Sequence, residues 1–166
     1  MTLDELLARE AIRALLAKCT QAGDSLRAGE YASCFTEDGV LQTETEGGGL
    51  GLDLRSRAEI LAWQTDKRKP GQGMGSGPVP LTFARHNLST SKIEITGPDS
   101  AQARTYWHVN TDIGPDHSGV YRDMFRRVDR EWLIGERRVK TEWAADNSLM
   151  VPPGSRPGDA SQRSLR

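Results

Sequence analysis

Thr82-Phe83-Ala84-Arg85-His86-Asn87-Leu88 opens the first of four long segments of β-strand character, and these segments decide the fold. The turns between them are short and rich in Gly, Pro, Asp and Ser. Consecutive strands joined by short turns indicate an antiparallel meander. We predict strands over residues 82–96, 101–113, 120–128 and 132–143, with turns at 97–100, 114–119 and 129–131.

Helical patterns precede the meander. Leucines, Ile12 and Cys19 recur at spacings of three and four from Leu3 to about Leu26, and Thr2 with Glu5 fits a capping box. We predict further helices over 30–35 and 56–69, and a strand over 40–45 between them. Helices first and a curved meander afterwards indicate an α+β fold, with three N-terminal helices packed on a strongly curved, mainly antiparallel sheet.

The chain of 166 residues is most simply one domain over residues 1–144, followed by a tail rich in Pro, Gly, Ser and Arg over 145–166. The glycine-rich run 47–51 lacks the Gly-Lys-Ser/Thr of a phosphate loop, so it predicts a flexible hairpin or lid. Residues 70–80 hold glycines and prolines and predict a loop at the mouth of the fold.

The composition excludes several partners. A net charge of −1 and a pI near 6.3 give no electrostatic footprint for nucleic acid or an anionic membrane. No apolar run is long enough to span a bilayer, and residues 1–10 lack a signal-peptide pattern, so we expect a cytoplasmic protein. Cys19 and Cys34 predict reduced, buried thiols, and no spacing indicates a metal site.

Three stretches resemble the SnoaL-like branch of the nuclear transport factor 2-like superfamily. They are residues 10–16 with Asp24 and 35–40, Arg85-His86-Asn87-Leu88, and residues 119–123 with 125–129 and Trp132. The resemblance implies a cone closed by helices around an apolar pocket. Members of the superfamily include polyketide cyclases, scytalone dehydratase, bile-acid dehydratase, a lindane dehydrochlorinase, ketosteroid isomerase and non-catalytic dioxygenase β subunits, so the fold alone does not decide the function.

The resemblance also implies a catalytic pair. Dehydratase and dehydrochlorinase members share an Asp on the first helix and a His on a long strand, and Asp24 and His86 match those positions. A histidine with a pKa of about 6.5 can take or give a proton at physiological pH, and a buried carboxylate orients its ring and stabilises the imidazolium. Each residue alone is also consistent with a structural role, Asp24 as a solvated helix end and His86 as a strand residue bonded to backbone.

Other residues complete the predicted site. Tyr121 is a candidate electrophilic donor, although a core tyrosine is an equal alternative. We expect the pocket to be lined by Trp107, Val109, Phe35, Trp63 and Cys19. Thr105, Trp107 and Val109 share one strand face, while Tyr106 and His108 face away, and His117 lies in the predicted turn and should be exposed.

The chain also departs from its relatives. Several dehydratases carry a tyrosine about five residues before the helix Asp, where Cys19 stands here, and the last-strand arginine of the bile-acid enzyme falls near Thr141. We therefore predict a cofactor-independent lyase or isomerase, without a metal, acting on a different small apolar and cyclic molecule. The alternative is a non-catalytic subunit that binds a small ligand or serves in assembly. We expect a homodimer or homotrimer, because the outer face of such a sheet commonly needs cover.

Overall fold

The computed structural model describes residues 2–44, 50–66, 81–152 and 156–157. Its helices are α1 (Leu3–Asp24), α2 (Ala28–Ser33) and α3 (Arg57–Asp66). Its strands are β1 (Phe35–Glu44), β2 (Leu50–Leu54), β3 (Ala84–Gly97), β4 (Ser100–Thr111), β5 (Gly114–Val128) and β6 (Glu131–Ala144). Residues 67–69 of the predicted third helix, the loop 70–80 and most of the tail lie outside the described residues, as do 47–49 of the glycine run.

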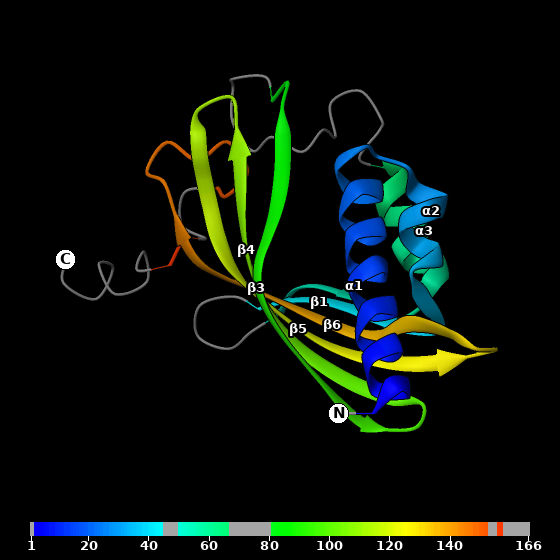
Figure 1. The fold of residues 1–166 in the computed structure, drawn as a ribbon. Helices are drawn as coiled ribbons and strands as arrows, with labels where there is room; N and C mark the ends of the chain where they lie inside the picture. The colour runs from blue at the N-terminus through cyan, green and yellow to red at the C-terminus, as the bar shows by residue number, and fades with distance from the viewer. Residues whose placement is uncertain (1, 45–49, 67–80, 153–155, 158–166) are drawn as a thin grey trace.

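The strands form one sheet in the order β2-β1-β6-β5-β4-β3. All neighbouring pairs are antiparallel except β1 with β6. Figure 1 shows that the long strands bend strongly and that the three helices gather on one side of the sheet, with α1 nearest to it. The predicted α+β class and the antiparallel meander are confirmed.

The core lies between α1 and the inner face of the sheet. The buried residues of α1 recur at the predicted helical spacing: Ile12, Leu15, Leu16, Cys19 and Ala22. Along β4, buried and exposed residues alternate strictly from Ala101 to Val109, because successive side chains of a strand point to opposite faces. Thr105, Trp107 and Val109 therefore face inward, while Tyr106 and His108 face outward, as predicted.

One predicted turn is wrong. Residues 114–119 belong to β5, and the chain turns instead at residues 112–113 between β4 and β5. Gly114 has a φ of +87°, a backbone conformation that glycine adopts without strain and other residues avoid. Pro115 and Asp116 resemble turn residues, but Pro115 pairs with Asn110 at the end of the ladder.

The helix predicted over 30–35 is displaced towards the N-terminus. It spans Ala28–Ser33, and Phe35 begins β1 instead of ending the helix. The reason is tertiary: Phe35 pairs with Ile134 of β6, and the amide of Ile134 donates to the carbonyl of Cys34 at 2.8 Å. A strand partner distant in sequence thus outweighs the local helical pattern.

No helix among the described residues is both long enough and apolar enough to cross a membrane.

Candidate active site

Asp24 and His86 form a hydrogen-bonded pair between the last residue of α1 and the start of β3. His86 Nδ1 lies 2.6 Å from Asp24 Oδ1, and the backbone amide of His86 donates to Asp24 Oδ2 at 3.0 Å. The His86 side chain is 24% exposed and the Asp24 side chain 2%, so the carboxylate is buried and the ring is accessible. The carboxylate can only accept from the ring, which assigns the proton to Nδ1 and leaves Nε2 as a base.

Asp24 and His86 line a partly enclosed cavity of about 150 Å³. Helices α1, α2 and α3 contribute to its wall together with β1, β2, β3, β5 and β6. Its lining combines aromatic and aliphatic side chains with a few polar groups. Besides Asp24 and His86, the lining includes Cys19, Tyr31, Trp63, Tyr121 and Arg137.

Tyr121 lines this cavity from β5. Its ring stacks on Trp107 of β4, with centroids 5.4 Å apart, and the guanidinium carbon of Arg137 lies 4.4 Å from its centroid. Burial raises the pKa of Tyr121 well above its ordinary value. The hydroxyl is therefore neutral and can donate a hydrogen bond into the cavity.

Arg137 and Asp123 form an ion pair inside the fold, which the sequence analysis did not find. Arg137 Nε and Nη2 donate to the two carboxylate oxygens of Asp123 at 2.8 and 2.9 Å, and Nη1 lies 3.5 Å from Cys19 Sγ. Both side chains are almost fully buried. Burial opposes the charge, but Asp123 holds the pKa of Arg137 above its ordinary value. The cavity wall thus contains a guanidinium that stays charged and whose charge is balanced by Asp123.

A signal for this pair was present in the sequence. Asp123 shares the inward face of β5 with Tyr121 and Phe125, so a charged residue stood at a core position. The analogy with the bile-acid enzyme pointed instead to Thr141, four residues beyond the arginine that lines the cavity.

The predicted pocket residues lie in three different places. Cys19 and Trp63 line the cavity, as do His86, Asp24 and Tyr121. Trp107 and Val109 form a second small apolar cluster with Tyr121 and stand behind the cavity wall. Phe35 is fully buried in the main core and does not line the cavity, because its strand position points it towards Tyr31 and the core.

A second histidine–aspartate pair lies on β5. His117 is buried and not exposed as predicted, and its Nδ1 lies 2.7 Å from Asp116 Oδ1. The register between β4 and β5 shifts here, since Val109 pairs with His117 and Asn110 with Pro115. Asp116 is the extra residue of this β-bulge. A bulge breaks the alternation of the strand, which explains why two consecutive residues are both buried.

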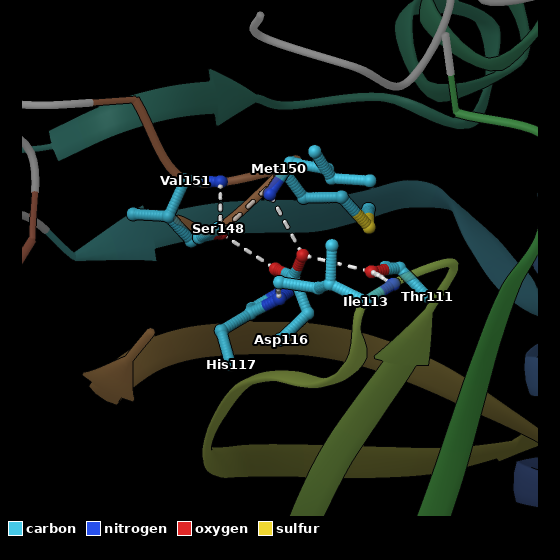
Figure 2. Close-up of polar contacts among 8 residues, drawn as sticks. Thr111, Ile113, Asp116, His117, Ser148, Met150 and Val151 are labelled. Atoms are coloured by element: carbon cyan, nitrogen blue, oxygen red, sulfur yellow. Dashed lines mark hydrogen bonds and ion pairs between the residues drawn. The ribbon is translucent and has the colours of Figure 1, made fainter. Parts of the chain in front are cut away.

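Asp116 also fixes the segment that follows β6 (Figure 2). Its carboxylate accepts from Ser148 Oγ at 2.6 Å, from the amide of Leu149 at 2.8 Å and from Thr111 Oγ1 at 3.0 Å. Burial works to raise the pKa of Asp116, but these hydrogen bonds outweigh it and hold the pKa below its ordinary value. Residues 145–151, which the sequence assigned to the tail, are thereby tied to the sheet, and Met150 packs against the cluster of Trp107.

Within the described residues, no group of three or more His, Cys, Asp or Glu side chains is arranged to hold a metal ion.

The fold and the pair together define a class: α+β proteins whose helices and bent sheet enclose a cavity with a histidine–aspartate pair in its wall. The chain belongs to the SnoaL-like domain family, whose sequence model matches residues 4–138. The resemblance inferred from the sequence is therefore confirmed. No curated protein matches the chain significantly.

Solved structures with the same fold share little sequence with the chain. A putative scytalone dehydratase from Novosphingobium aromaticivorans is 18% identical, with a TM-score of 0.72 over 95% of this chain and 97% of its own. The β subunit of a putative aromatic-ring-hydroxylating dioxygenase from the same organism is 16% identical, with a TM-score of 0.71 over 88% and 96%. A hexachlorocyclohexane dehydrochlorinase is 18% identical, with a TM-score of 0.64 over 92% and 98%.

Proposed function

We propose that the protein is a cofactor-independent lyase or isomerase of the dehydratase or cyclase type, in which His86 removes a proton from carbon. The observation that carries this proposal is the geometry of the pair: a buried carboxylate holds Nδ1, Nε2 is left outside this hydrogen bond, and His86 lines a partly enclosed cavity. A base positioned in this way typically contributes 10²–10⁴-fold to a rate. The family and the similarity to a putative scytalone dehydratase and a hexachlorocyclohexane dehydrochlorinase support an elimination-type reaction.

The chemistry begins at a carbon next to a carbonyl or a leaving group. His86 Nε2 accepts the proton, and the electrons of the broken C–H bond form a new double bond. In an elimination, the bond to the leaving group breaks and the leaving group departs with its electron pair. In an isomerisation, the electrons reach the carbonyl oxygen as an enolate, and the proton returns to another carbon. Asp24 stabilises the imidazolium during either course.

One side chain can stabilise the negative charge that develops away from the base. The neutral hydroxyl of Tyr121 can donate to a carbonyl or leaving oxygen, whereas the charge of Arg137 in the same cavity is already balanced by Asp123. Donors fixed before the reaction need no rearrangement when the charge appears. A cavity of about 150 Å³ holds a ligand about the size of benzene, so the reacting part of the substrate is a single small ring.

Exchange of an α-proton tests the proposed base without knowledge of the natural substrate. Cyclohexanone in D₂O is followed by proton NMR with the wild type, His86→Asn and Asp24→Asn. We expect enzyme-dependent exchange in the wild type and a loss of roughly 10²-fold or more in His86→Asn, in line with the removal of a general base. His108→Asn, on the exposed face of β4, is the matched control and should keep the wild-type rate.

Two outcomes would contradict the proposal. Equal exchange in the wild type and in His86→Asn would show that His86 is not the base. Saturable binding of cyclohexanone without any exchange would favour a ligand-binding subunit, which is the alternative function for this fold.

A further inference from the structure

The proposed catalytic pair contributes to the walls of two hollows of different size. One is the partly enclosed cavity of about 150 Å³. The other is a more open groove of about 690 Å³ between α1 and the edge strand β3. Asp24 and His86 line both hollows, so the groove begins at the side chain that we propose as the base.

The groove differs from the cavity in its charge. Arg13 of α1 and Arg85 of β3 line it from its two sides. Among the described residues that line the groove, the one carboxylate is Asp24, and its two oxygens already accept from His86. The positive charge of Arg137 in the cavity, by contrast, is balanced by Asp123.

Both groove arginines are available to a ligand. Arg13 contacts Glu10 at 3.5 Å, but both side chains are more than half exposed, and such pairs contribute little. Arg85 lies over the ring of Phe83 at 5.8 Å and has no carboxylate partner among the described residues. A guanidinium binds carboxylate and phosphate oxygens through paired hydrogen bonds, which makes arginine well suited to anion recognition.

The rest of the groove offers neutral hydrogen-bonding groups. Thr20 and Gln21 contribute from α1, and Asn87, Ser89 and Ser91 from β3. β3 is also the last strand of the sheet, and the His86 amide points away from β4 towards Asp24. Alternate residues of an edge strand present their backbone groups outward, so Leu88, which lines the groove, adds a backbone donor and acceptor.

We propose that the substrate has two parts, a ring that enters the cavity and an extension that lies in the groove and ends in an anionic group held by Arg13 and Arg85. The anion is a carboxylate or a phosphate ester. This inference rests on the proposed function, because it places the reacting ring at His86. The groove then determines specificity: it selects molecules by charge at a distance from the carbon that reacts.

Binding of three matched probes tests the proposal. 3-Phenylpropionate, 3-phenylpropyl phosphate and 3-phenylpropan-1-ol share one ring and one linker and differ in the terminal group. We expect isothermal titration calorimetry to show at least one anion binding about tenfold more tightly than the alcohol, the effect of roughly one charge-assisted contact. Added salt should weaken the binding of the anion and leave the affinity for the alcohol unchanged.

Paired variants locate the effect. Arg13→Gln/Arg85→Gln should bind the anions and the alcohol equally, whereas Arg104→Gln, an exposed arginine on the outer face that contacts Tyr106, should keep the preference. A preference that survives the double variant, or a wild type that binds all three probes equally or none of them, would overturn the proposal. The relative affinities of the two anions decide between carboxylate and phosphate.

The test separates this inference from the proposed function. His86→Asn should retain the preference for an anion while it loses α-proton exchange. A wild type that prefers the anion but exchanges no proton would refute the lyase and leave the anion site standing. Proton exchange without any preference for an anion would refute the anion site and leave the proposed lyase standing.

Discussion

Replacing Asp123 by Leu removes the charged partner of a guanidinium that is almost fully buried. Arg137 is 4% exposed in its side chain, and Asp123 accepts from two of its nitrogens. The remaining contacts of the guanidinium are the thiol of Cys19 and the ring of Tyr121, neither of which carries a charge. The variant Asp123→Leu therefore leaves an unbalanced buried charge.

The size of the effect follows from this geometry. Removing one partner of a buried ion pair costs about 3–5 kcal/mol, which for a domain of this size lowers Tm by roughly 6–20 °C. Arg137→Met should cost a similar amount, because the carboxylate of Asp123 is then unpaired. The double variant Asp123→Leu/Arg137→Met buries no charge, and replacing a whole buried pair by apolar residues is often neutral or stabilising.

A double-mutant cycle measures the coupling. Urea unfolding followed by circular dichroism gives the free energy of unfolding for the wild type, both single variants and the double variant. We expect the double variant to be more stable than either single one, with a coupling energy of about 2–3 kcal/mol or more. Strictly additive losses would refute the reasoning, because they would mean that each charge is stabilised independently of the other.

Three other predictions concern positions outside this pair. Gly119→Ala should lower stability by at least about 1–3 kcal/mol, measured by thermal unfolding, because a Cβ there would lie 2.8 Å from the Trp107 ring and closer still to backbone. Burial lowers the pKa of His117, so below about pH 6.5 the unfolded chain binds a proton more readily than the folded chain, and the free energy of unfolding should fall as the pH drops. His117→Gln should remove this pH dependence, measured by unfolding at a series of pH values, whereas the exposed His108→Gln should keep it. Arg130→Gly should raise Tm by a few degrees, since Arg130 has a φ of +72° that costs about 1 kcal/mol in a non-glycine residue; an unchanged Tm would contradict this.

The sequence predicted those parts of the molecule that depend on regular periodicity. The spacing of Ile12, Leu15 and Cys19 placed the buried face of α1, and the alternation around Trp107 placed the inward face of β4. Asp24 and His86 are 62 residues apart, and no local pattern joins them. Their proximity was predicted only through the family, whose fold brings the end of the first helix to a long strand.

The errors arose where a distant contact outweighs a local pattern. Pro115-Asp116 has the composition of a turn, but Asp116 is held inside the fold by Thr111 and by Ser148, 32 residues further along the chain. Phe35 continues a helical pattern but pairs with β6. Arg137 lies in a segment rich in charged residues, which is typical of a protein surface. In the structure it pairs with Asp123 of β5 and lines the cavity.

The hydrogen bond from the His86 amide to Asp24 has a consequence for the solubility of variants. β3 is an open edge of the sheet, and unpaired amides on such an edge can recruit a strand from another molecule. Asp24 occupies one of these amides with the same carboxylate that orients the imidazole. Asp24→Ala would free the amide and favour aggregation, whereas Asp24→Asn retains an oxygen that can accept from it. A loss of activity in Asp24→Ala therefore mixes two causes, and only the asparagine variant reports on catalysis alone.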